Sequence, residues 1–119
     1  MKVILDSSFL IQCIEKKADL SNFVFEEQVH LITTESIVNE LKELSAEKNK
    51  KGINASLALL LLQSNKVEAY KTQEEHDNSV IELAVKEKAG IATADDGLSR
   101  RARRLNLKVY YVKEGGKIV

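Results

Sequence analysis

The chain has 119 residues, of which 18 are acidic and 18 basic, so its formal net charge is zero. This length predicts one domain over residues 1–119, and the balanced charge argues against a globally basic nucleic-acid binder. The sequence contains neither an apolar run of roughly 20 residues nor a signal-peptide pattern, so we expect a cytoplasmic protein with no membrane contact.

Strands and helices are predicted to alternate along the chain. We expect strands over 2–5, 29–33, 67–70, 91–93 and 108–112, helices over 7–16, 53–63 and 74–88, a short segment over 20–25, a helix opening at Thr34 or Ser36, a loop over 46–52, and a helix from Asp95 or Asp96 to Leu105. Ser7 or Ser8 is expected to cap the first helix, and Gly90 to end the helix over 74–88. This order predicts an α/β fold, a three-layer α/β/α sandwich around a mainly parallel sheet of about 4–5 strands.

The predicted helix over 53–63 is apolar on almost every side. Its leucines exceed what one packing face requires: Leu57, Leu59, Leu60, Leu61 and Leu62. Two explanations stay open, namely deep burial of the whole helix and self-association of the chain as a homodimer.

Two of the predicted strands lead directly into carboxylates. Asp6 follows the run Val3–Leu5, and Asp95 with Asp96 follows the run Ile91–Thr93 after one intervening residue. Because the carboxyl ends of parallel strands meet at one edge of a sheet, where open α/β sheets bind ligands, these acids are expected to lie close together.

Helical spacing directs two further acids toward the same interior. Glu40 is flanked by Ile37, Leu41 and Leu44 on its helix, and Asp77 shares a stripe with Val80, Ile81 and Ala84. Each acid alone is also explained as a helix cap, a helix-dipole acid or an exposed residue. The coincidence of all four favours a cluster.

Such a cluster needs a compensating cation, because burying several carboxylates together is strongly unfavourable. With one cysteine, Cys13, and two isolated histidines, His30 and His76, any metal must be held mainly by oxygen. Mg²⁺ or Mn²⁺ suits such a site, and the chemistry that these ions support is phosphodiester hydrolysis.

Polar and basic residues surround the predicted cluster. The hydroxyls of Ser8 and Thr93 each lie two residues from an aspartate and could orient it, although a helix cap and a buried strand residue are equally good explanations. All the arginines of the chain follow Asp96 within one short segment: Arg100, Arg101, Arg103 and Arg104. They indicate a local positive surface, either a solvated helix face or a phosphate contact.

Four motifs, in this order and spacing, resemble those of the PIN domain family of metal-dependent nucleases. They are Val3–Ile11, Ile37–Leu41, His76–Ala84 and Ala92–Arg101, with Leu107–Val112 similar to the last strand of the family. The resemblance covers essentially the whole chain. Ser8 stands where many members carry Asn, and Ala94 where Asn is common, which puts the orientation of the acids in doubt rather than their identity.

The resemblance implies the roles of the acids and the activity. Asp6, Glu40, Asp77 and Asp95 would be the catalytic, metal-binding acids, with Asp96 an auxiliary ligand and Thr93 a supporting hydroxyl. The family's activity is endonucleolytic cleavage of single-stranded RNA with one or two Mg²⁺ or Mn²⁺ ions, and the arginines would hold flanking phosphates.

Alternatives stay open at the level of the sequence. A catalytically weak PIN-like scaffold would bind RNA or a protein, and a receiver-like phosphoacceptor domain would also gather aspartates around magnesium, although the inward Glu40 and Asp77 fit it poorly. Within the nuclease interpretation, the sequence does not separate a toxin, which has an antitoxin partner, from a ribosomal-RNA processing enzyme, which has a ribosome-processing partner.

Overall fold

The computed structural model describes residues 1–119 as five strands and six helices. The strands are β1 (Lys2–Leu5), β2 (His30–Thr34), β3 (Glu68–Tyr70), β4 (Gly90–Ala92) and β5 (Val109–Tyr110). The helices are α1 (Ser7–Glu15), α2 (Leu20–Glu27), α3 (Glu35–Ser45), α4 (Lys50–Ser64), α5 (His76–Glu87) and α6 (Asp96–Arg104). The predicted alternation is therefore confirmed. No helix combines the length and the apolar character that crossing a membrane requires.

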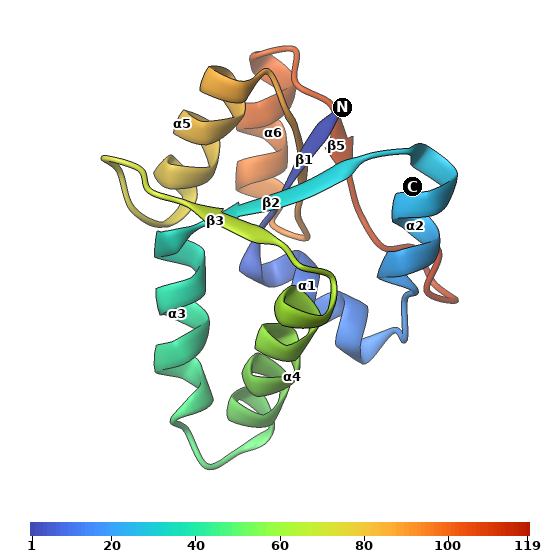
Figure 1. The fold of residues 1–119 in the computed structure, drawn as a ribbon, viewed down its shortest axis with the longest axis vertical. Coiled ribbons are helices and arrows are strands. Elements are labelled where there is room, and N and C mark those ends of the chain that lie inside the picture. The colour runs from blue at the N-terminus through green and yellow to red at the C-terminus, as the bar shows by residue number, and fades with distance from the viewer.

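All five strands form one parallel sheet in the order β3-β2-β1-β4-β5. Figure 1 shows α5 and α6 on one side of the sheet and α1, α3 and α4 on the other, which confirms the three-layer α/β/α fold. The chain runs outward from β1 through β2 to β3 and then returns to β4 on the other side of β1. The connections after β1 and β4 therefore diverge, and a ligand site is expected between them at the carboxyl ends of these strands.

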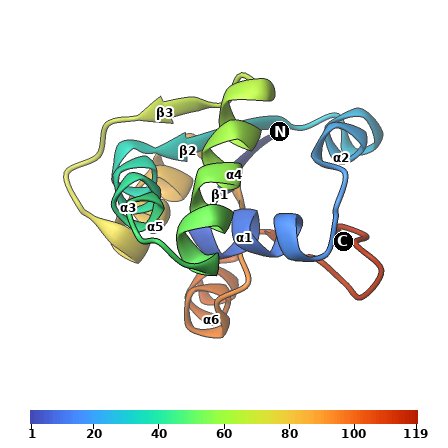
Figure 2. The ribbon, with the colours of Figure 1, turned by 90° about the horizontal axis from the view of Figure 1, so that it is seen from below.

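One apolar core of 26 buried residues holds the layers together. The central strand β1 contributes Val3, Ile4 and Leu5, none of which has any exposed surface. At one end of the sheet, α2 packs near the C-terminal segment, as both ribbon views show (Figure 2). There the rings of Phe23 and Tyr110 meet edge to face, with their centroids 5.1 Å apart.

Several predicted boundaries and caps are wrong for local reasons. Neither Ser7 nor Ser8 caps α1, because both hydroxyls bind carboxylates. Lys88, not Gly90, adopts the left-handed conformation at the end of α5. Gly90 belongs to β4, where a Cβ would lie only 3.2 Å from the Lys108 carbonyl oxygen. The last strand is also shorter than the predicted 108–112, since β5 ends at Tyr110.

Helix α4 starts three residues earlier than predicted. Asn49 caps it by accepting a hydrogen bond from the Gly52 N–H, so residues 50–52 are helical rather than part of the loop. On its outer side Ile53 and Leu60 remain 62% and 58% exposed, whereas Leu62 is buried. Deep burial of the whole helix is therefore wrong, and an apolar stripe faces outward.

Gly52 is expected to be essential to the turn between α3 and α4. A Cβ at this buried position would overlap the backbone carbonyl of Glu47, which no side-chain movement can relieve. Gly52→Ala should therefore lower the free energy of unfolding by about 1–3 kcal/mol, as overpacking does. Urea denaturation measures this change, with Ser56→Ala on the exposed side of α4 as the control. Equal stability of Gly52→Ala and wild type would contradict the packing described here.

Candidate active site

Asp6 is the centre of the candidate site, and it is held by both β1 and β4. Asp6 follows Leu5, which pairs in register with Ala92. The backbone N–H of Asp6 donates a hydrogen bond to the Ala92 carbonyl at 3.0 Å. The residue is only 3% exposed. The parallel register therefore places a buried carboxylate beside Thr93, the residue that follows β4.

Two hydroxyls donate to the same oxygen of Asp6. Ser8 Oγ lies 2.6 Å from Asp6 Oδ2, and Thr93 Oγ1 lies 2.8 Å from it. Each hydroxyl in turn accepts a backbone N–H, from Ala94 at 3.0 Å for Ser8 and from Asp95 at 3.0 Å for Thr93. All these hydrogen bonds point toward the carboxylate and strengthen one another. Oδ1 of Asp6 accepts none, so it is the oxygen available to a ligand.

Asp95 begins α6 as its N-cap. Its Oδ1 accepts the Leu98 N–H at 3.0 Å, so the cap explanation considered from the sequence is confirmed. The other oxygen, Oδ2, has no protein partner, and the residue is exposed. Asp96 follows in the first turn and forms no side-chain hydrogen bond. Capping occupies one oxygen of Asp95 and leaves the second free for a ligand.

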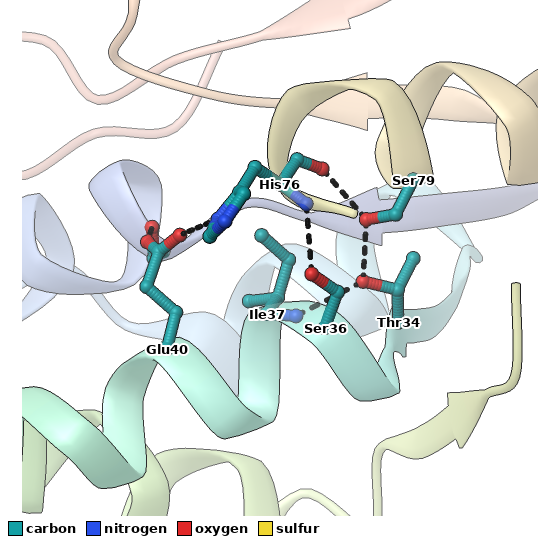
Figure 3. A network of polar contacts seen from close by, with 7 residues as sticks. Thr34, Ser36, Ile37, Glu40, His76 and Ser79 are labelled. Carbon is teal, nitrogen blue, oxygen red and sulfur yellow. Dashed lines mark hydrogen bonds and ion pairs between the residues drawn. The ribbon is translucent and has the colours of Figure 1, made fainter. Parts of the chain in front are cut away.

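Glu40 is held from two sides. Ser7 Oγ donates to Oε1 at 2.5 Å, and His76 Nδ1 contacts Oε2 at 3.1 Å (Figure 3). The hydrogen bond to Glu40 is the largest cause that raises the pKa of His76. Each carboxylate oxygen has two lone pairs, so these contacts orient Glu40 without exhausting its capacity as a ligand.

A second set of hydrogen bonds joins the first turns of α3 and α5. The His76 N–H donates to Ser36 Oγ at 2.7 Å, and Ser79 Oγ donates to the His76 carbonyl at 2.6 Å. Because the Ser79 proton is committed there, Thr34 Oγ1 is the donor in its 2.9 Å contact with Ser79. Figure 3 shows these groups between the two helices. They fix α3, which carries Glu40, against α5, which carries Asp77.

The four predicted acids influence one another electrostatically. Burial raises the pKa of Asp6, and the charges of Asp77 and Glu40 raise it further, although the hydrogen bonds from Ser8 and Thr93 oppose this. Burial also raises the pKa of Asp77, as do the charges of Asp95 and Glu40. The structure thus brings the residue after β1, residues of α3 and α5, and the N-cap of α6 into one negatively charged region.

Little positive charge compensates this region. No lysine or arginine forms an ion pair with Asp6, Asp77, Asp95 or Asp96, and the ion pair that reaches Glu40 comes from His76. Arg101 lowers the pKa of Asp77 and so offsets part of the repulsion. An excess of oxygen donors with incomplete compensation fits a hard divalent cation in chemistry and charge.

The acids do not converge into a preformed metal cage. No three carboxylate, imidazole or thiolate side chains are arranged so that together they could hold an ion. Asp6 is fixed, whereas Glu40, Asp77 and Asp95 lie at partly or fully exposed positions. The donor set therefore fits a divalent cation by its chemistry, while its side-chain arrangement is open.

The arginines of α6 have different surroundings. Arg101 Nη2 donates to Asn78 Oδ1 at 2.8 Å and thereby links α6 to α5 beside Asp77. Arg100, Arg103 and Arg104 are exposed and form no ion pair. Three arginines of α6 are thus free, and the fourth is engaged beside Asp77.

Two residues of the site were not found from the sequence. The sequence predicts only a helix cap for Ser7 and leaves His76 an isolated histidine, yet both hold Glu40. No periodic pattern connects residue 7 or 76 with residue 40, so only the packing of α1, α3 and α5 reveals them. Cys13 has no such role: it is buried, and burial raises the pKa of its thiol to about 12.

The parallel sheet with helices on both faces defines a three-layer α/β domain, and a family model gives its class. The model described as a PIN like domain matches residues 3–114, so the chain belongs to the PIN domain family. The resemblance drawn from the motifs is therefore confirmed.

Relatives of known sequence or structure agree with this assignment. The chain is 31% identical to ribonuclease VapC9 of Archaeoglobus fulgidus over 97% of this chain and 85% of that protein. Its fold is similar to that of the PIN domain endonuclease Utp24, with a TM-score of 0.82 at 22% identity over 98% of this chain and 88% of the other. A domain of a functionally unknown protein from Methanocaldococcus jannaschii has a TM-score of 0.67 at 14% identity, covering 99% and 95% of the two chains.

Asp6 is expected to destabilise the folded protein in the absence of metal. The pKa of Asp6 is raised in the folded state, so its charged form is disfavoured there. This lowers the free energy of unfolding at pH values above the folded pKa, and the effect is absent at pH values below the ordinary Asp pKa. Asp6→Asn keeps an acceptor for Ser8 and Thr93, so it should raise the free energy of unfolding at pH 7 in EDTA. The gain should disappear at about pH 3.5.

Urea denaturation at both pH values measures this difference. Asp19→Asn is the matched control, because Asp19 caps the remote helix α2 and Asn serves equally well there. An Asp6→Asn variant less stable than wild type at pH 7 would contradict the electrostatic description.

Proposed function

We propose that this chain is a Mg²⁺- or Mn²⁺-dependent endoribonuclease that hydrolyses phosphodiester bonds of single-stranded RNA. The observation that carries the proposal is the buried Asp6 at the carboxyl ends of β1 and β4, close to three further acids. The charges of Asp77 and Glu40 raise the pKa of Asp6, and the charges of Asp95 and Glu40 raise the pKa of Asp77. Family membership supports the same reaction, since one relative is named a ribonuclease and another an endonuclease.

In this proposal, Asp6, Glu40, Asp77 and Asp95 hold the metal, with Asp96 as an auxiliary ligand. Ser8 and Thr93 keep Oδ2 of Asp6 engaged, so that Oδ1 faces the ligand. A bound Mg²⁺ or Mn²⁺ would polarise the phosphate and lower the pKa of a water ligand. The raised pKa values of Asp6 and Asp77 mean that these carboxylates gain more from a cation than ordinary surface acids do.

The exposed arginines of α6 supply the RNA affinity that the acidic region lacks. Arg100, Arg103 and Arg104 are free to contact phosphates on either side of the cleaved bond, whereas Arg101 combines such a contact with its hold on Asn78. These contacts position the strand without reading its sequence. Their contribution is expected to decrease as the salt concentration rises.

A non-catalytic scaffold is the second candidate, and two observations favour it. The acids are not preassembled around an ion, and α4 presents the exposed apolar residues Ile53, Leu57 and Leu60 to a partner or to a second copy of the chain. A scaffold would bind RNA or protein equally well in the presence and absence of a chelator, whereas the nuclease requires the metal.

The partner protein would distinguish the two biological settings, a toxin and a ribosomal-RNA processing enzyme. A toxin would be encoded beside a small antitoxin that blocks the acidic region, and a processing enzyme would instead associate with a ribosome-processing protein. We propose the nuclease activity for both settings, and the neighbouring reading frame distinguishes them.

Cleavage of single-stranded RNA in Mn²⁺ tests the proposed activity. Wild type and Asp19→Asn should cleave, and Asp6→Asn and Asp95→Asn should be at least about a hundredfold slower, because metal-held acids supply several kcal/mol to the transition state. Gel analysis of labelled RNA measures the rates, and circular dichroism confirms that each variant is folded. Equal cleavage by all four proteins would indicate a contaminating nuclease and contradict the proposal.

A further inference from the structure

A polar cavity of about 370 Å³ adjoins the acidic region, and the function proposed above leaves part of its wall without a role. It shares Thr93, Asp95 and Asp96 with the candidate site, and its wall continues with Gln12 of α1, Ser99 and Arg103 of α6, and Tyr111 after β5. Its volume lies within the range of about 300–1,000 Å³ that is typical of small-ligand sites. A group that enters it would therefore adjoin the carboxylates.

The cavity wall offers free hydrogen-bonding groups. The side chains of Gln12, Ser99, Arg103 and Tyr111 form no hydrogen bond or ion pair within the protein, in contrast to those of Ser7, Ser8 and Thr93 nearby. None of these four side chains has a fully buried polar atom that lacks a hydrogen-bond partner. An amide, a hydroxyl, a guanidinium and a phenol thus face the same solvent-filled space.

Tyr111 is the one aromatic residue of this wall, and its backbone is firmly held. Its N–H donates to the Val119 carbonyl at 2.9 Å, and the Val119 N–H donates back at 3.0 Å. The next residue, Val112, is buried and pairs with Ile118. Tyr111 itself is 41% exposed. An aromatic residue therefore lines the cavity from a backbone that is fixed by two hydrogen bonds.

We propose that this cavity is a nucleobase-binding subsite for the nucleotide next to the cleaved phosphate, an inference that rests on the ribonuclease function proposed above. The Tyr111 ring stacks on the base, as aromatic side chains do with unpaired bases. Gln12 and Ser99 face the hydrogen-bonding edge of the base, and Arg103 binds the phosphate that follows it.

The combination of groups determines this class of ligand. A purely apolar ligand would leave Gln12, Ser99 and Arg103 without partners, and an isolated phosphate would not use Tyr111. A base joined to a phosphate uses all of them. Because Thr93 and Asp95 belong to both places, the strand can pass directly from the subsite to the acids.

Binding measured without cleavage tests the subsite. The probes are a short fluorescein-labelled oligouridylate and an oligomer of the same length and charge that lacks bases, with Ca²⁺ as the divalent cation and intactness checked on a gel. Wild type should bind the oligouridylate more tightly than the abasic oligomer. Tyr111→Ala should lose about tenfold in affinity for the oligouridylate only, as expected for one lost stack.

Two further variants separate stacking from a general structural effect. Tyr111→Phe keeps the ring and should bind as wild type does. Phe25→Ala removes another exposed aromatic residue, from the remote helix α2, and should change neither affinity. Unchanged binding by Tyr111→Ala, an equal loss for both oligomers, or no preference of wild type for bases would overturn the proposal.

Failure of the subsite can be distinguished from failure of the proposed ribonuclease function. If base-dependent binding through Tyr111 is present while Mn²⁺ supports no cleavage, the subsite holds and the chain is a scaffold. If cleavage depends on Asp6 while Tyr111→Ala binds normally, the nuclease holds and the subsite is wrong.

Discussion

The pairing of β1 with β4 is the constraint on which the rest of the site depends. Their register aligns Leu5 with Ala92, and the hydrogen bond from the Asp6 N–H to the Ala92 carbonyl extends it by one residue. Asp6 is thereby buried against the hydroxyl of Thr93. Thr34, at the end of the neighbouring strand β2, joins the hydrogen bonds between the first turns of α3 and α5, the helices that carry Glu40 and Asp77.

Burial of the Asp6 carboxylate at the carboxyl ends of β1 and β4 lowers the free energy of unfolding when the group is charged. The hydrogen bonds from Ser8 and Thr93 offset the hydration that the buried Asp6 carboxylate loses only in part, since its pKa remains raised. A free energy of unfolding of a few kcal/mol can tolerate one such group when the core is well packed. In the function proposed above, the same imbalance would make a divalent cation a stabilising ligand of the folded state.

The sequence predicts the architecture well, because strands and helices differ in hydrophobic period and the acids follow strand ends or lie on inward helical stripes. That Asp6, Glu40, Asp77 and Asp95 lie near one another could be predicted in this way. Ser7 and His76 could not, since their contacts with Glu40 depend on how three helices pack. Gly90 was misjudged because its close approach to Lys108 belongs to the tertiary structure, and the outward stripe of α4 depends equally on which side its neighbours cover.

Binding of Mn²⁺ is the most direct test of the central claim. That claim is that Asp6, Glu40, Asp77 and Asp95, near the carboxyl ends of β1 and β4, form a divalent-cation site. Titration calorimetry on wild type and Asp19→Asn should give the same affinity for Mn²⁺. Asp6→Asn should weaken it by at least about tenfold, because loss of a metal-site group commonly costs that much or more. Equal Mn²⁺ affinity in Asp6→Asn and wild type, or no Mn²⁺ binding by wild type, would contradict the account.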